Sequence, residues 1–94
     1  MAEIIGFSRM EVRFVRQFKK LYRKALAEIQ VAFDSRLEMF LTNPNHPLLK
    51  SHPLRGKLAG CFTINITGDW RAIYELVNST VIFLSLGTHS QLYK

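Results

Sequence analysis

The sequence predicts an α+β fold in which a short N-terminal strand and a helical hairpin precede an antiparallel meander of three strands, with the helices on one sheet face. Two changes in hydrophobic pattern predict it. Apolar residues recur every three or four positions over residues 9–41, and they alternate with polar residues beyond residue 57. With 94 residues, 48% of them hydrophobic, the chain can build one core, so we expect a single domain over residues 1–94.

The first half of the chain is expected to form a strand and two helices. Residues 3–8 favour a short strand, although Gly6 weakens it, and Ser8 could cap the helix that follows. The helical period then runs through residues 9–41. A break near residues 22–24 would divide this segment into two packed helices, each with one apolar stripe.

The second half is expected to form a loop and three strands. Prolines and asparagines end the helical pattern, so residues 42–56 are predicted to form a long loop. Alternation then predicts strands over residues 61–67, 70–77 and 80–86, joined by Gly-Asp and Asn-Ser turns. Gly87 is expected to end the last strand.

The chain is strongly basic, with 13 Lys and Arg against 7 Asp and Glu and a formal net charge of +6. Such a balance favours polyanionic partners. Seven basic residues and one acid lie in residues 9–24, which fits either a solvated helix face or a surface for a polyanion. A second group lies in the predicted loop, where we expect three side chains to bind substrate: Lys50, Arg55 and Lys57.

Other features narrow the class of protein. The single cysteine, Cys61, cannot form an intrachain disulfide, and its place in a strand predicts a buried thiol. No apolar run reaches the length of a membrane span, and the N-terminus lacks the pattern of a signal peptide. We therefore expect a cytoplasmic protein without a membrane partner.

Chemistry-bearing residues concentrate in the last third of the chain. They form three short segments: His52-Pro53-Leu54-Arg55-Gly56, Gly68-Asp69-Trp70-Arg71, and Gly87-Thr88-His89-Ser90-Gln91-Leu92-Tyr93. Imidazole suits proton transfer because its ordinary pKa of about 6.5 is near working pH. Together with a carboxylate, a guanidinium and aromatic rings, this set suits the handling of a phosphodiester.

These three segments resemble the RelE/ParE superfamily of bacterial type II toxins, and within it the YafQ-like branch. The resemblance covers residues 46–94, and residues 14–21 are also similar to the first helix of that family. It implies a RelE-like toxin domain that cuts messenger RNA on the ribosome without a metal or cofactor. It also implies a cognate antitoxin that holds the toxin inactive in a hetero-oligomer.

The resemblance assigns roles to individual residues. His89 is expected to be the general acid, and either Asp69 or His52 the general base. Arg71 would stabilise the charge on the phosphorane. Trp70 or Tyr93 would stack on a base. Structural roles remain open for some of them, because His52 precedes a proline in a loop and Asp69 lies in a turn.

Two positions depart from the YafQ-like pattern. Asn65 stands where a further histidine is expected, and Ser85 stands where an arginine is expected. Arg71 or Arg55 could supply the missing charge. Alternatively, the chain is a weakened or ParE-like member that binds a protein or nucleic acid without cleaving RNA. A third possibility is a general RNA-binding protein that uses the basic first helix.

Overall fold

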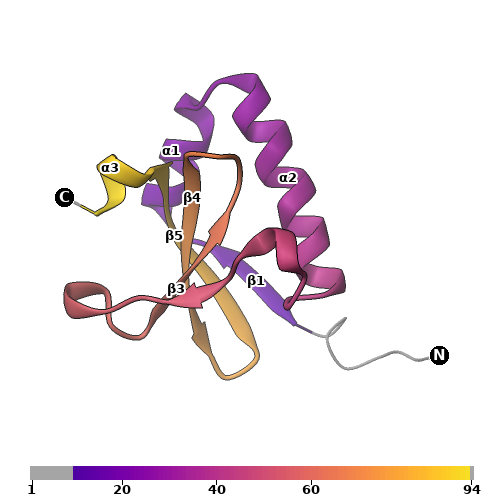
Figure 1. The fold of residues 1–94 in the computed structure, drawn as a ribbon, viewed down its shortest axis with the longest axis vertical. Helices are drawn as coiled ribbons and strands as arrows, with labels where there is room; N and C mark the ends of the chain where they lie inside the picture. Colours follow the sequence, from indigo (N-terminus) through magenta and orange to yellow (C-terminus); the bar gives the residue numbers. More distant parts are fainter. Residues whose placement is uncertain (1–9, 94) are drawn as a thin grey trace.

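The computed structural model describes residues 10–93. Its helices, strands and two short 3-10 turns run in the following order (Figure 1): β1 Glu11–Phe14, α1 Arg16–Lys24, α2 Ala27–Thr42, η2 Pro47–Leu49, β2 His52–Pro53, η3 Gly56–Leu58, β3 Cys61–Asn65, β4 Trp70–Val77, β5 Thr80–Thr88 and α3 His89–Leu92. This is the predicted α+β architecture, and the predicted meander corresponds to β3, β4 and β5. Among the described residues, no helix has the length and apolar character needed to cross a membrane.

The described strands form one five-stranded sheet in the order β1-β5-β4-β3-β2. Strands β2 to β5 pair antiparallel, whereas β1 runs parallel to β5, so the first and last of the described strands are neighbours. Figure 1 shows α1 and α2 at the top of the view, and α3 with the C-terminus at the left. Both helices pack on one face of the sheet, because Phe18 on α1 and Phe33 on α2 contact Phe83 on β5.

An aromatic cluster joins the hairpin to this face. Phe83 on β5 is fully buried, and its ring centroid lies 5.7 Å from Phe14 on β1, 5.6 Å from Phe18 on α1 and 5.3 Å from Phe33 on α2. Burial of these large rings is the main source of stability for such a small domain. Phe40 on α2 extends the cluster to Tyr74 on β4.

The start of the first helix was predicted wrongly. Glu11–Phe14 is a strand, whereas the sequence predicted helix from residue 9. Val12 and Phe14 face the core while Glu11 and Arg13 are exposed, a period of two that overlaps the helical period of the residues that follow. The parallel pairing with β5 stabilises these residues as a strand. The strand predicted over residues 3–8 lies outside the described residues.

Other boundaries moved by a few residues. The break between the helices falls at Ala25 and Leu26, not at residues 22–24, because both have extended backbone with ψ of 153° and 150°. The predicted loop over residues 42–56 contains η2 and the edge strand β2. Strand β5 continues through Gly87, since Gly87 pairs with Arg71 on β4.

Candidate functional site

The sheet face opposite the helices carries the polar residues singled out in the sequence. Paired residues of antiparallel strands point to the same face. The register therefore gives two rows across this face: His52, Thr63, Ile73 and Ser85 in one, and Asn65, Arg71 and Gly87 in the next. Asn65 and Ser85, the two departures from the expected pattern, thus share a face with Arg71 and His52.

A β-bulge places Ser85 on this face. Tyr74 pairs with Phe83, but Ile73 pairs with Ser85, so Leu84 is an extra residue on β5. The bulge shifts the alternation, which lets Phe83 and Leu86 both enter the core and turns Ser85 toward Arg71's side. The buried apolar residues of β5 accordingly change from a spacing of two, between Val81 and Phe83, to a spacing of three, between Phe83 and Leu86.

His89 and Asp69 are adjacent at one end of this face. The backbone N–H of His89 donates to the carbonyl of Asp69 at 3.0 Å, which ties the start of α3 to the turn between β3 and β4. The His89 ring lies 4.6 Å from the ring of Tyr93, centroid to centroid, at an interplanar angle of 71°. Three predicted site residues from two segments are therefore brought together here.

The short helix α3 is held by a capping box. The Thr88 hydroxyl accepts from the Gln91 N–H at 3.3 Å, and the Gln91 side-chain oxygen accepts from the Thr88 N–H at 2.8 Å. This pair fixes the direction in which His89 leaves β5. The Thr-x-x-Gln spacing could have predicted it from the sequence.

Arg71 projects from β4 beside this junction. One of its terminal guanidinium nitrogens, Nη1, donates to the carbonyls of Thr67, Gly68 and Trp70 at 3.1 to 3.2 Å. The side chain is half-buried, and the described residues give it no carboxylate partner. A guanidinium held by neutral carbonyls keeps its full charge for an anion.

His52 lies farther along the sheet. It is exposed on the edge strand β2, and β3 separates it from the strand of Arg71. Two strand spacings correspond to about 10 Å. The structure therefore does not bring His52 next to Asp69, but places it on the other side of Arg71 from His89.

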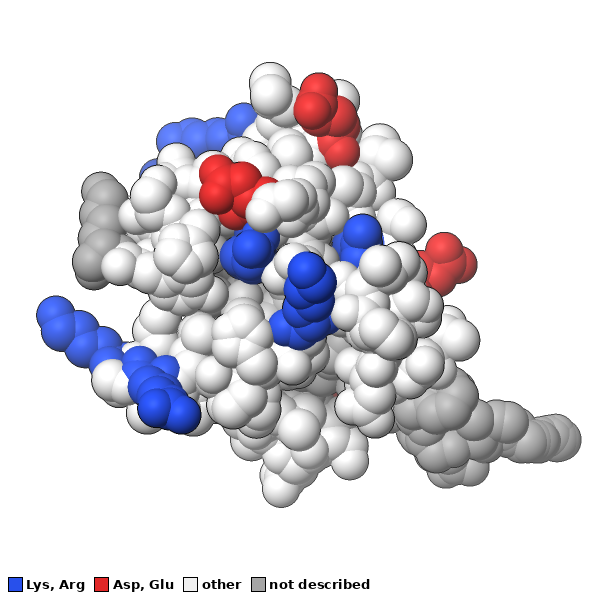
Figure 2. Space-filling view, viewed as in Figure 1, with Lys and Arg blue, Asp and Glu red and all other residues white. Residues whose placement is uncertain are grey.

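The predicted substrate-binding cations flank β2. Lys50 follows η2, Arg55 precedes η3, Lys57 lies within η3, and all three are exposed. Figure 2 shows Lys and Arg side chains across the middle of its view and at its lower left, and Figure 1 shows the segment between β2 and β3 at the lower left. Asp and Glu lie toward the top and right.

Trp70 lies on the other side of the sheet from Arg71. Neighbouring residues of a strand point to opposite faces, and the half-buried Trp70 packs against the core. Tyr93 is also half-buried, but it contacts His89. Of the two aromatic residues named for stacking, Tyr93 is the one beside the other site residues.

Two titratable groups on the strands of the sheet have raised pKa values. Burial raises the pKa of the Tyr74 hydroxyl, and a hydrogen bond with Ser51 partly opposes this shift. Burial, with a repulsion from Glu75, raises the pKa of the Cys61 thiol. Cys61 is half-buried rather than buried, and the raised pKa keeps it a neutral thiol near pH 7.

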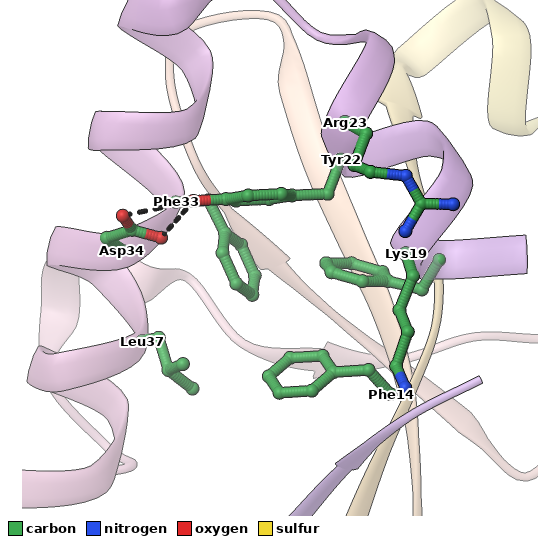
Figure 3. A pocket seen from close by; sticks show the side chains of 8 residues that line it. Phe14, Lys19, Tyr22, Arg23, Phe33, Asp34 and Leu37 are labelled. Carbon is green, nitrogen blue, oxygen red and sulfur yellow. Dashed lines mark hydrogen bonds between the residues drawn. The ribbon is translucent and has the colours of Figure 1, made fainter. Parts of the chain in front are cut away.

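A separate cleft lies on the helix side, between α1 and α2 (Figure 3). Its volume is about 320 Å³, and rings from β1, α1 and α2 form its walls. The Tyr22 hydroxyl crosses to α2 and donates to the Asp34 carboxylate at 2.8 Å, while Lys19 and Arg23 lie at its edge. The cleft is therefore apolar inside and basic along α1.

Comparison with known proteins gives the family. The profile of the family described as "Bacterial toxin of type II toxin-antitoxin system, YafQ" matches residues 9–94. None of the curated proteins compared with the chain matches it. Among solved structures, the fold is similar to YafQ from E. coli strain BL21(DE3), with 22% identity, coverage of 92% of this chain and 100% of that chain, and a TM-score of 0.78.

Two further structures share the fold. The E. coli DinJ-YafQ toxin-antitoxin complex is 22% identical over 92% of this chain and 99% of that chain, with a TM-score of 0.76. The YoeB/ParE toxin from Agrobacterium tumefaciens is 20% identical over 85% and 99%, with a TM-score of 0.72. Since the family profile spans nearly the whole chain and the fold agrees, this protein belongs to the YafQ family of bacterial type II toxins.

Proposed function

We propose that this toxin is an endoribonuclease that cuts messenger RNA on cytoplasmic ribosomes. The observation that carries the proposal is the order of groups across one sheet face: His52 on β2, Arg71 on β4, and His89 where β5 ends. In-line transfer at phosphorus needs a base and an acid on opposite sides of the phosphate and a cation between them. The arrangement supports that requirement.

The chemical step needs no group beyond these side chains. A base takes the proton of a ribose 2′-hydroxyl, and the 2′-oxygen forms a bond to the adjacent phosphorus. The bond from phosphorus to the 5′-oxygen breaks, and His89 gives that oxygen a proton. The products are a 2′,3′-cyclic phosphate and a 5′-hydroxyl, while Arg71 balances charge on the phosphoryl oxygens.

The geometry favours His52 over Asp69 as the base. The attacking and departing oxygens lie on opposite sides of phosphorus, so the acid and the base approach it from opposite sides. Asp69 is bonded through its backbone to His89 and so belongs to the acid side. His52, two strands from Arg71, lies on the opposite side. The Asp69 carbonyl then holds the start of α3, which carries His89.

The test is cleavage of ribosome-bound message by purified toxin and its variants. We expect His89→Ala to reduce the rate at least about a hundredfold, since general acid catalysis contributes that much. His46→Ala is the matched control, because His46 caps η2 and lies outside the site. A folded His89→Ala protein that cleaves at the normal rate would contradict the proposal.

A second candidate is a family member that binds without cleaving, and Asn65 with Ser85 favours it. These residues occupy the catalytic face but supply neither an imidazole nor a cation. Toxicity that survives His89→Ala, with no RNA cut by the unaltered protein, would support this function instead.

We also propose that a cognate antitoxin occupies the cleft between α1 and α2 with an apolar side chain from an acidic segment. The support is charge complementarity: the edge formed by Lys19 and Arg23 is basic, and the interior is aromatic. An antitoxin segment bound in the cleft lies on the helix side of the sheet. Other segments of the antitoxin would have to cover the sheet face that carries His52 and Arg71. The antitoxin segment that fits this cleft would have acidic residues beside a bulky apolar residue.

Charge reversal tests this docking surface. The double change Lys19→Glu and Arg23→Glu should weaken antitoxin binding at least about tenfold, through slower association and lost complementarity. The matched control is Lys20→Glu with Lys24→Glu, which gives the same charge change on exposed residues that do not line the cleft. Equal loss in both double variants would refute a role for the cleft.

A further inference from the structure

The position of one proton on His52 follows from its neighbour. The Nδ1 atom of His52 lies 2.9 Å from the carbonyl oxygen of Lys50. A carbonyl oxygen only accepts hydrogen bonds, so Nδ1 must carry the proton. In the neutral ring the other nitrogen, Nε2, then holds a lone pair.

The backbone of Lys50 creates this contact. Lys50 has φ 46° and ψ 40°, in the left-handed region that residues other than glycine seldom adopt. It ends η2, where its N–H donates to the carbonyl of Pro47 at 3.2 Å. The left-handed turn reverses the chain so that the Lys50 carbonyl faces the ring two residues later.

Ser51, which lies between the two residues of this contact, and His52 itself are both tied to the core. The Ser51 hydroxyl lies 3.1 Å from the hydroxyl of Tyr74, which is 6% exposed. His52 itself pairs with Thr63, which is fully buried on β3. These two contacts hold the backbone that carries the Lys50 carbonyl and the His52 ring.

The neighbouring histidine has the opposite arrangement. Nδ1 of His46 accepts from the N–H of Leu48 at 3.1 Å, so its neutral ring must carry the proton on Nε2. The backbone thus fixes two histidines of one loop in different tautomers. Of these two, only His52 presents an unprotonated Nε2.

We propose that Lys50 is a positioning residue whose left-handed backbone locks His52 as the Nδ1–H tautomer and so presents Nε2 as the proton acceptor. The catalytic consequence rests on the proposed function. There, the O–H bond of the 2′-hydroxyl breaks and an N–H bond forms at Nε2. The resulting imidazolium keeps its Nδ1–H bond to the Lys50 carbonyl, which stabilises the new charge.

Two variants isolate the backbone effect from the loss of the ammonium group. Lys50→Gly and Lys50→Val both remove the charge, but glycine adopts positive φ readily and valine does not. The first measurement is ¹⁵N NMR of the imidazole nitrogens in the full-length protein at about pH 8, which is above the ordinary pKa of a free imidazole, about 6.5. Unaltered toxin should show a protonated Nδ1 on His52 and a protonated Nε2 on His46.

Lys50→Gly should keep the Nδ1–H form of His52, and Lys50→Val should move it toward the Nε2–H form. An Nε2–H signal for His52 in the unaltered protein would overturn the proposal, as would an unchanged His52 spectrum in Lys50→Val.

The second measurement separates this inference from the ribonuclease proposal. Lys50→Val should cleave RNA about tenfold more slowly than Lys50→Gly, because a misplaced base loses part of its contribution. Equal rates with the expected tautomers would overturn the positioning role. If the tautomers are as expected and no protein cleaves RNA, the ribonuclease function fails while the assignment of the His52 proton stands.

Discussion

Arg71 is held in a way that preserves its charge. Three backbone carbonyls fix one end of the guanidinium, and the one ion pair in the described part of the chain, between Arg13 and Glu11, lies elsewhere. Carbonyls orient the fork without neutralising it. A single ordered cation is therefore available at the face where an RNA phosphate would lie.

The first prediction concerns the residue that could add a second cation. Ser85→Arg should raise the rate of RNA cleavage about ten- to a hundredfold, since an added cation at a phosphorane stabilises the transition state. Ser85 is half-buried in the row next to Arg71, so a guanidinium there would reach the same phosphate.

Single-turnover cleavage of ribosome-bound message measures this effect. Ser79→Arg adds the same charge in the exposed turn between β4 and β5 and should leave the rate near its original value. A rate that does not rise in a folded Ser85→Arg protein would show that the site is not limited by charge.

At the scale of elements, the junction of β5 and α3 sets the direction of His89. A Cβ added at Gly87 would lie 3.0 Å from the side-chain oxygen of Gln91, which accepts from the N–H of Thr88. A side chain at this position would therefore press on Gln91, where strand and helix are in close contact.

The second prediction follows from that contact. Gly87→Ala should displace Gln91 and break the capping box, which costs about 1 kcal/mol of local stability. Melting temperature should fall by about 4–8 °C at most, while cleavage falls more than about tenfold because His89 shifts. Gly68→Ala is the control, since its added Cβ meets no atom within 4 Å. Equal effects in both variants would contradict this account.

The sequence could predict the elements whose local pattern and tertiary setting agree. The strands β3, β4 and β5 follow from alternation, and α2 follows from its apolar spacing. The strand β1 could not be predicted, because the four residues have a pattern that also fits the start of a helix, and only their pairing with β5 decides. The bulge at Leu84 likewise depends on packing by Leu86.

The same distinction applies to the site. The sequence could predict the types of the site residues, their order along the chain and the turn that carries Asp69. The contact between the Asp69 carbonyl and the His89 backbone depends on how two distant segments meet. The left-handed conformation of Lys50 was not predictable, because lysine has no preference for that region.

At the scale of the molecule, basic residues lie on both sides of the sheet. Helix α1 carries Lys19 and Arg23 on the helix side, whereas Arg71 projects from the opposite face. We expect the first side to bind an acidic protein and the second to bind RNA. The proposed function therefore predicts that RNA binds at the sheet face, whereas a general RNA-binding protein would use α1.

The third prediction uses the salt dependence of RNA binding. Three or four phosphate contacts give a slope of about −2 to −3 for log affinity against log salt with single-stranded RNA. Binding by the His89→Ala protein should show this slope, and Arg55→Ala with Lys57→Ala should make it shallower. Lys19→Glu with Arg23→Glu should leave it unchanged; a shallower slope there would place the RNA on α1.

The parallel pairing of β1 with β5 has a consequence for when the toxin can become harmful. The Thr80 hydroxyl donates a hydrogen bond to the Glu11 carboxylate, and the two residues are 69 positions apart in the chain. Closing so large a loop is slow and carries an entropic penalty. Because β5 lies between β1 and β4, we expect earlier fragments to lack a complete sheet. The nascent toxin would therefore remain inactive until β5 has emerged from the ribosome that makes it. This delay gives an antitoxin time to bind the new chain.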